Sequence, residues 1–297
     1  MHISVLLEES INYLNLKKDS IIVDCTLGYG GHSSKILEKI KEGYLYAFDQ
    51  DKEAIIEAEK KLKKIGNNYK IINKNFVNIE EIKKQVDGIL FDLGVSSPQL
   101  DEDYRGFSYH KDAKLDMRMN QNQELSAHTV VNEYPIDKLI KIFKTYGEEK
   151  YSIPIAKAIV NSRPVETTLE LAEIIKGSVP ESYRRKAHPA RKIFQAIRIE
   201  VNDELNVFEK TLRTSLKMLK QNGRICVITF HSLEDKICKE IFKEVSTVKK
   251  ELQNLPIIPE EYKPKYKIIA NIKPTENEIK NNNRSRSARL RVIERVK

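Results

Sequence analysis

The chain has 297 residues, 40% of them hydrophobic, which is enough for one large or two medium domains. Lysine and arginine number 52 against 43 aspartate and glutamate, and the net charge of +9 fits either a polyanionic partner or a merely lysine-rich composition. The three cysteines are unevenly spaced, and no apolar run approaches the ~20 residues that span a bilayer. A disulfide scaffold, a cysteine metal site and a membrane protein are therefore disfavoured, and we expect a cytoplasmic protein.

The first third of the chain alternates between strand and helix patterns. In the second expected helix, apolar side chains share one face and lysines occupy the opposite one. Such alternation is typical of a parallel sheet whose faces are covered by helices. The expected elements are strands at 20–25, 43–48, 69–73 and 87–93, and helices at about 33–41, 52–65 and 78–84.

The pattern changes after the fourth expected strand. Residues 99–132 are polar and carry few strand or helix signals. Residues 135–200 have helical periodicity, which includes a capping box formed by Thr167 and Glu170. A proline-containing break then precedes a helix at 191–201. This part of the chain is therefore expected to be all-helical.

Strand signals return in the last third of the chain. A long helix is expected to stop at Asn222-Gly223, because glycine commonly ends helices. Ser232 is the expected cap of the next helix. The expected elements are helices at about 203–221 and 236–245, strands at 223–230, 266–272 and 288–296, and a polar, mobile loop over 278–286.

The simplest account of this order is a single α/β sheet with an insertion. Residues 1–102 and 201–297 would form the sheet and its covering helices, and residues 103–200 would be an all-helical insertion between the fourth and fifth strands. Two sequential domains are the alternative. Too few strands are expected after residue 203 to build an independent sheet, which favours the insertion.

The turn after the first strand contains the most informative motif. Asp24 ends an apolar run, Gly28, Gly30 and Gly31 follow, and a helical pattern begins directly afterwards. Glycines at such a turn allow a ligand to lie against the backbone, and doubly wound α/β folds hold nucleotide-like cofactors there. The third glycine of a dinucleotide fingerprint is replaced by Ser33, so the match to a nicotinamide site is only partial.

Three acids follow three of the expected strands. Asp24, Asp49 and Asp92 would lie at the same edge of a parallel sheet, where they would disfavour a pyrophosphate and favour a cationic ligand such as S-adenosylmethionine. Asp49 also lies where a carboxylate accepts hydrogen bonds from ribose hydroxyls. The alternative is that Asp24 and Asp49 cap the following helices, although Asp51 is the better cap for the second helix.

Several longer motifs resemble one protein family along almost the whole chain. The resemblance is to the bacterial RsmH (MraW) family, whose members are S-adenosylmethionine-dependent methyltransferases acting on N4 of a cytidine in 16S ribosomal RNA. The motifs occur in the same order as in that family. They are the Gly-Gly-His turn, Phe91–Asp101, Arg105–Tyr109, Leu115–Met119, Lys144–Glu149 and Thr229–Asp235.

The resemblance implies a class I (Rossmann-like) S-adenosylmethionine-dependent methyltransferase sheet with an inserted all-helical domain. The sequence shows no metal-binding cluster, although RNA could bring an Mg²⁺ ion. Phe76 would offer a stacking face for adenine, although a phenylalanine after a strand is also a common core residue. The residues implied to bind the cofactor are Gly30, Gly31, His32, Asp49, Phe76, Asp92 and Gln99.

Methyl transfer to an exocyclic amine requires a hydrogen-bond acceptor, because the nitrogen lone pair is delocalised into the ring. Asp92, or a backbone carbonyl of 93–98, is the expected acceptor for N4–H. The insertion is expected to recognise RNA, through Arg184, Arg185, Lys186, His188, Arg191 and Lys192. A second basic cluster contains Arg284, Arg286, Arg289 and Arg291. Either cluster is equally compatible with a solvated surface.

The expected partner is 16S ribosomal RNA or the assembled small ribosomal subunit, with no DNA and no membrane. Whether the chain forms a homodimer is left open by the sequence. A DNA or small-molecule methyltransferase is the second candidate, and the absence of a D/N-P-P-Y motif after the fourth strand disfavours DNA. A non-catalytic nucleotide- or RNA-binding module is the third, and the acidic cofactor site disfavours it.

Overall fold

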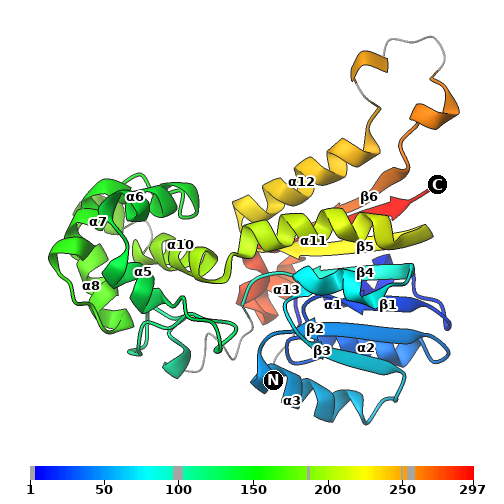
Figure 1. Ribbon diagram of the computed structural model, residues 1–297, viewed down its shortest axis with the longest axis horizontal. Coiled ribbons are helices and arrows are strands. Elements are labelled where there is room, and N and C mark those ends of the chain that lie inside the picture. The colour runs from blue at the N-terminus through cyan, green and yellow to red at the C-terminus, as the bar shows by residue number, and fades with distance from the viewer. Residues whose placement is uncertain (1–3, 96–102, 186–187, 249, 253–257) are drawn as a thin grey trace. The chain divides into compact units, whose positions relative to one another are not determined.

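The computed structural model describes residues 4–95, 103–185, 188–248, 250–252 and 258–297. The chain forms two compact units, the first from Met1–Gly94 with Leu205–Lys297 and the second from Val95–Glu204 (Figure 1). The second unit begins earlier and ends later than the insertion expected at 103–200. Each unit has its own core.

The first unit contains a seven-stranded sheet with the order β3-β2-β1-β4-β5-β7-β6. The strands β3 to β5 in this order pair in parallel, and β7 runs antiparallel to both β5 and β6. The expected α/β class, with a largely parallel sheet covered by helices, is confirmed. The strand bounds are β1 Ile21–Asp24, β2 Tyr44–Asp49, β3 Tyr69–Asn73, β4 Val86–Asp92, β5 Leu219–Thr229, β6 Tyr266–Ile272 and β7 Arg289–Arg295.

The order of the strands determines where a ligand can bind. The chain runs outward from β1 to β3 in one direction and then from β4 to β5 in the other, so β1 and β4 are neighbours at the point where the order reverses. In doubly wound sheets, ligands bind beyond the carboxyl ends of the strands at such a point. Asp24 ends β1 and Asp92 ends β4, so both acids lie at this position.

Successive strand residues pack into separate cores on the two faces of the sheet. Ile22 and Leu90 pack on the face covered by α1, α2 and α3, whereas Val23 and Phe91 pack on the face covered by α11 and α12 (Figure 1). Because both faces are covered, the middle parts of the central strands, such as Ile89–Phe91 and Ile225–Ile228, are continuously apolar. The helix bounds are α1 Leu7–Tyr13, α2 Gly31–Lys39, α3 Lys52–Leu62, α11 Glu204–Met218, α12 Ser232–Ser246 and α13 Glu276–Asn281.

Four local predictions for the first unit are wrong. The helix expected at 78–84 is a 3-10 turn over Phe76–Ile82, and the mobile loop expected over 278–286 contains α13 and the 3-10 turn Asn283–Ser287. Thr275 caps α13, and this cap was overlooked. The N-cap of α12 is His231 rather than Ser232.

The fourth error concerns the start of β5. The strand begins at Leu219, because Leu219 pairs with Val86 at the start of β4, and Asn222-Gly223 forms an irregularity inside the strand instead of a helix stop. Asn222 has a left-handed φ of 64° at this point. Two further 3-10 turns occupy Lys250–Leu252 and Glu260–Tyr262.

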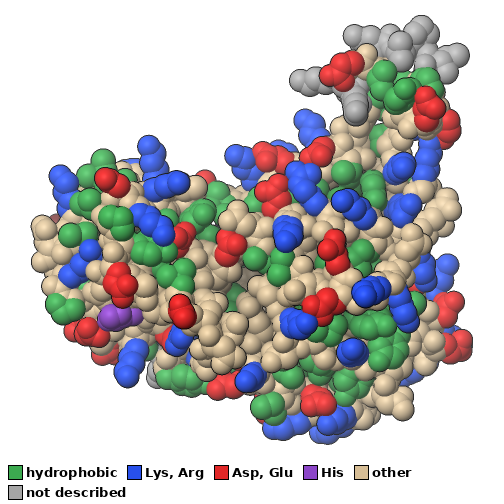
Figure 2. All heavy atoms as spheres, in the orientation of Figure 1, with side chains coloured by type: hydrophobic (Ala, Val, Ile, Leu, Met, Phe, Trp, Pro, Cys, Tyr) green, Lys and Arg blue, Asp and Glu red, His purple; other side chains and the backbone are tan. Residues whose placement is uncertain are grey.

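The second unit is helical apart from its first part, where Lys114 forms an isolated bridge with Thr167. Thr167 and Glu170 form the expected capping box at the start of α8. On the face in Figure 2, basic and acidic side chains of this unit are interspersed. The bounds are α5 Ala127–Glu133, α6 Ile136–Thr145, α7 Ser152–Asn161, α8 Thr168–Gly177, α9 Glu181–Arg184 and α10 Ala190–Asn202, with a 3-10 turn at Asp103–Arg105.

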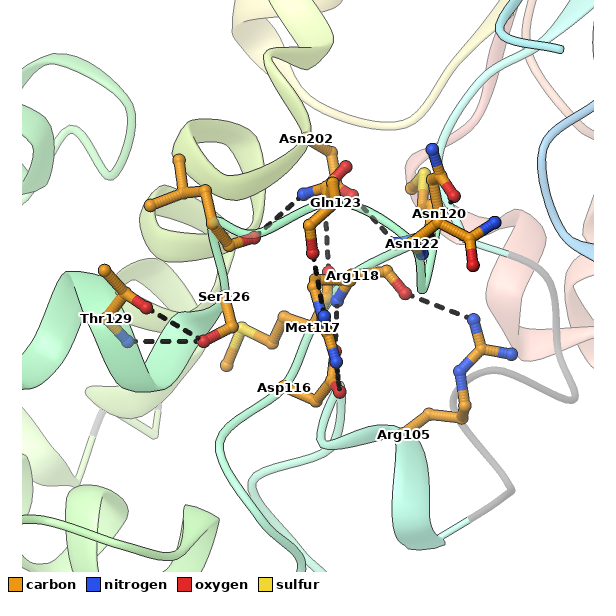
Figure 3. A network of polar contacts seen from close by, with 12 residues as sticks. Arg105, Asp116, Met117, Arg118, Asn120, Asn122, Gln123, Ser126, Thr129 and Asn202 are labelled. Atoms are coloured by element: carbon orange, nitrogen blue, oxygen red, sulfur yellow. Dashed lines mark hydrogen bonds and ion pairs between the residues drawn. The ribbon is translucent and has the colours of Figure 1, made fainter.

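Two of the family-like motifs meet in a polar network inside the second unit (Figure 3). Arg118 forms a two-point ion pair with Asp116 at 2.9 and 2.8 Å, and the Arg105 guanidinium donates to the carbonyl of Arg118. Asn202 of α10 donates to the carbonyl of Met117 and accepts from the amide of Met119, both at 2.8 Å. The network fixes an otherwise irregular segment by satisfying its backbone groups.

None of the described helices combines the length and the apolar composition needed to span a bilayer.

Candidate cofactor and active site

The glycine turn between β1 and α2 needs its glycines for different reasons. Gly30 is the N-cap of α2 with a left-handed φ of 78°, and a Cβ there would lie 3.1 Å from the Cβ of Ala58. A Cβ on Gly31 would clash with the Ser4 hydroxyl. Gly28 also has a positive φ, of 49°, but a Cβ there would meet only open space beyond the carbonyl of Thr26. The backbone at Gly28 is therefore the part of the turn that a ligand can approach.

Asp24 does not line an open surface, contrary to the expectation. Its side chain is fully buried, one oxygen accepts from the Ser33 hydroxyl at 2.7 Å, and the other accepts from the Thr26 amide at 3.0 Å. Burial raises the pKa of Asp24, and these hydrogen bonds oppose that rise. It is not the cap of α2 either, because Gly30 holds that position. Asp24 instead joins the end of β1 to the first turn of α2.

Asp49 at the end of β2 is partly exposed and lies beside the glycine turn. Its two oxygens accept from the amides of Gly28 and Asp51, at 2.8 and 2.9 Å. Asp51, not Asp49, caps α3, as expected. Burial raises the pKa of Asp49 to about 6, so the carboxylate predominates at neutral pH. The Gln50 amide also donates to Asp49. A carboxylate has about four acceptor positions, and therefore about one remains for a ribose hydroxyl.

Asp92 at the end of β4 and His32 in the first turn of α2 face each other. The distance from His32 Nδ1 to Asp92 Oδ2 is 3.5 Å, and the side chains are 5% and 24% exposed. Asp92 Oδ1 is buried without a hydrogen-bond partner among the described residues. Burial raises the pKa of Asp92 well above its usual value, and the charges of Asp24 and Glu234 raise it further. This carboxyl group is thus predisposed to hold a proton or to face a cation.

Two positioning residues of this cluster were missed by the sequence analysis. The Thr26 hydroxyl accepts from the Asp92 amide at 2.7 Å, which ties the end of β4 to the turn after β1. Glu234 in the first turn of α12 is 2% exposed and accepts from the Phe230 amide at 2.7 Å. The motif Thr229–Asp235 includes Glu234, but nothing in its spacing indicates that the charge of Glu234 acts on Asp92.

Of the remaining expected cofactor ligands, one can be placed. Phe76 begins the 3-10 turn after β3, is partly exposed, and meets Phe91 edge to face with 5.8 Å between ring centroids. It is therefore in part a core residue, as the alternative interpretation held, while part of its surface stays accessible. Gln99 lies outside the described residues.

The cluster suits a cationic, ribose-containing cofactor. The negative charge of Glu234 makes ionisation of Asp92 less favourable. In addition, a buried carboxylate oxygen without a hydrogen-bond partner, such as Asp92 Oδ1, is rare unless a ligand supplies the donor. The partly exposed Gly28 and the remaining acceptor position of Asp49 lie at the neighbouring turn. A ligand with an ammonium or sulfonium group would relieve the charge repulsion.

Comparison with known proteins places the chain in a family. A family model described as the MraW methylase family matches residues 1–296. The chain belongs to the MraW methylase family. This confirms the resemblance found in the motifs, and membership of a methylase family indicates that the chain uses S-adenosylmethionine as its methyl donor.

Two relatives match over almost their whole length. Both are named "Ribosomal RNA small subunit methyltransferase H". The protein from Exiguobacterium sibiricum is 51% identical over 100% of this chain and 98% of its own, and the protein from Mesoplasma florum is 52% identical over 99% of each. A solved rRNA methylase from Streptococcus thermophilus covers both chains completely but has a TM-score of 0.48 and 12% identity, which is too weak a likeness to add to the assignment.

Proposed function

We propose that this methyltransferase acts on small-subunit ribosomal RNA and transfers the methyl group of S-adenosylmethionine to N4 of a cytidine in 16S rRNA. Full-length relatives that carry the name of a small-subunit rRNA methyltransferase support the class of substrate. The partly exposed Asp92 carboxyl group supports an exocyclic amine as the methyl acceptor, and N4 of a cytidine is the position that the family resemblance implies.

The residues of the site divide into two groups by role. Asp49 accepts a hydrogen bond from the ribose, the backbone at Gly28 approaches the cofactor, and Phe76 offers its ring to the adenine. Asp92, held by Thr26 and His32, faces the reacting groups. When bound, S-adenosylmethionine supplies an electrophilic methyl group on a sulfonium.

Asp92 performs the acid–base part of the reaction. The lone pair of the cytosine amine is delocalised, and an acceptor on N4–H makes the nitrogen more nucleophilic. After transfer, the nitrogen carries an excess proton, and Asp92 takes it. The raised pKa suits this step, because a stronger base accepts the proton more readily.

The target cytosine must leave its base stack to reach a carboxyl group at the edge of a sheet. The substrate is therefore expected to be a single-stranded or locally opened RNA segment. Whether free 16S rRNA or the assembled small subunit is methylated depends on where that segment is accessible.

The decisive experiment is to map methylated nucleosides by mass spectrometry in small-subunit RNA from cells with and without this protein. We expect the loss of one N4-methylated cytidine, restored by the wild-type gene but not by the Asp92→Asn variant. An unchanged set of methylated nucleosides, or the loss of a methyl group at another base or atom, would contradict the proposal. Offering DNA as methyl acceptor in vitro tests the competing substrate class.

A further inference from the structure

Charge alone does not show which part of the chain contacts RNA. In each of the two expected basic clusters, at least one cation already has an acidic partner: Arg185 pairs with Glu181, and Arg291 pairs with Asp235. The second unit, Val95–Glu204, contains 17 basic and 17 acidic residues, so it has no net charge with which to attract a polyanion. If this unit recognises RNA, as the sequence predicts, it needs contacts of another kind.

Aromatic rings gather in the second unit where the segment after the first 3-10 turn meets the start of α10. The Tyr109 ring stacks on His188, with 4.8 Å between centroids and 21° between planes. His110 packs against Tyr109 at 4.2 Å and meets His188 edge to face at 6.0 Å. Phe194, which is 4% exposed, meets Tyr109 edge to face at 5.6 Å. Because His110 and His188 are exposed, the cluster extends from the core to the surface.

Both chain segments that carry these rings are held in place. The hydroxyl of Thr168, a fully buried residue of α8, donates to the Lys111 carbonyl at 2.6 Å and accepts from the Ala113 amide at 3.0 Å. At the start of α10, His188 Nδ1 accepts from the Ala190 amide at 3.3 Å. A surface that is already ordered loses little conformational entropy when a ligand binds to it.

The His188 side chain is an uncharged ring at neutral pH. Burial lowers its pKa, and the charges of His110 and Lys176 lower it further. Acceptance of a hydrogen bond by Nδ1 also requires the neutral form, because both ring nitrogens of a charged imidazole are donors. His188 therefore offers an aromatic face, and not the positive charge for which it was grouped with the neighbouring arginines.

We infer that Tyr109, His110 and His188 form a stacking platform for an unpaired nucleobase of the substrate RNA, separate from the cytidine that is methylated. The inference rests on the proposed function. Proteins recognise single-stranded RNA largely by stacking its bases on aromatic side chains. A neutral, planar base adds one more layer to the existing stack of Tyr109 and His188. The stacked base is a second one, because the platform belongs to the second unit and Asp92 to the first.

Substitutions that remove or keep the ring test the inference. His188→Ala removes one ring of the stacking platform, and His188→Phe keeps a ring without the imidazole nitrogens. His110→Ala and His110→Phe form a second pair at a side chain for which no hydrogen bond has to be replaced. The matched control is His128→Ala in the same unit, because the His128 imidazole pairs with the Glu166 carboxylate at 3.4 Å and contacts no ring among the described residues.

Binding of a labelled single-stranded fragment of small-subunit rRNA is measured by anisotropy at pH 8 and at several salt concentrations. The KM for S-adenosylmethionine and the thermal stability of each variant are measured alongside. We expect His188→Ala to weaken RNA binding roughly 5- to 100-fold, the range for loss of one base–aromatic stack, and His188→Phe to restore most of it. The slope of log affinity against log salt should not change, because no phosphate contact is lost.

The KM for S-adenosylmethionine should stay at the wild-type value, and His128→Ala should bind RNA as the wild type does. Equal losses in the alanine and phenylalanine variants at both positions would overturn the inference. So would lower thermal stability with unchanged RNA binding, since the rings would then only support the fold. Normal binding of free RNA with slower methylation of assembled subunits would also overturn it, because the rings would then contact a protein.

Abasic nucleotides identify the base that is stacked. One position at a time, the base is removed from the RNA fragment, and the affinity of the wild type is compared with that of His188→Ala. At one position, we expect removal of the base to weaken wild-type binding and to abolish the difference between the two proteins. A difference that persists at every position would mean that the platform does not stack on a base.

Failure of the proposed function is recognised separately. If the wild-type protein binds S-adenosylmethionine but neither binds nor methylates small-subunit RNA, the proposed function fails and the inference with it. If the wild type methylates the RNA and the ring variants bind it equally well, the function stands and only the stacking platform is excluded.

Discussion

Two stretches of the same sheet edge carry opposite charge. Near the ends of β1 and β4, the buried acids Asp24 and Glu234 raise the pKa of the partly buried Asp92. At the connection between β6 and β7, lysines and arginines are exposed. The comparison teaches that buried acids select a small cationic ligand through desolvation, whereas exposed cations suit a long polyanion.

The largest effect is expected from neutralising Asp92 in the acidic stretch of the sheet edge. Asp92→Asn keeps the shape of the side chain but removes the proton acceptor, and we expect kcat to fall by about 10²–10⁴-fold. Affinity for S-adenosylmethionine, measured by calorimetry, should also fall, by a smaller factor, because Asp92 is one of the acids that favour the cationic cofactor. The matched control is Asp87→Asn, at the opposite end of the same strand. Equal turnover in wild type and Asp92→Asn would exclude Asp92 as the acceptor.

The pH dependence of cofactor binding examines the acid beside the ribose. Asp49 has a pKa raised to about 6 by burial. It is ionised above that pH and loses acceptor capacity as the pH falls through it, so affinity for S-adenosylmethionine should decline by at most about tenfold per pH unit below 6. Calorimetry from pH 5 to 8 measures this. If cofactor affinity in the Asp49→Asn variant has the same pH profile as in the wild type, a group other than Asp49 causes the pH dependence.

Adjacent serines of α2 test how the buried Asp24 is stabilised. Ser33→Ala removes a donor to a fully buried carboxyl group, and we expect a loss of about 1–3 kcal/mol in the free energy of unfolding. Ser34→Ala is the control, because the Ser34 hydroxyl is buried without a hydrogen-bond partner among the described residues. Urea unfolding measures both variants. Equal losses would mean that the Ser33 contact adds nothing specific.

The smallest expected effect concerns the glycine turn. Gly30→Ala forces a left-handed φ on alanine and brings its Cβ close to Ala58, which should cost about 1–2 kcal/mol. Gly177→Ala at the end of α8 meets nothing within 4 Å and should be neutral or stabilising by about 0.5–1 kcal/mol. Thermal unfolding of the two variants shows which substitution lowers the stability and which leaves it unchanged or raises it. A stable Gly30→Ala variant would show that the turn tolerates a side chain.

Local patterns in the sequence determined the class of fold and the identity of the acids. The apolar strands, the glycine turn and the Asp51 cap could be predicted, because each depends on residues within a few positions of one another. The motifs likewise identify the family from the sequence alone. Asp49 and Asp92 are at the strand ends where they were expected.

Only the tertiary structure determined how deeply each of those acids is buried and which basic side chains are exposed. Asp24 is fully buried, the charge of Glu234 raises the pKa of Asp92, and Arg291 is bound to Asp235, because strands distant in the sequence pair and bring these groups together. The same pairing places the connection between β6 and β7 at the edge that holds the acids. Burial and long-range electrostatics depend on which strands are neighbours, and the spacing of residues along a chain does not contain that information.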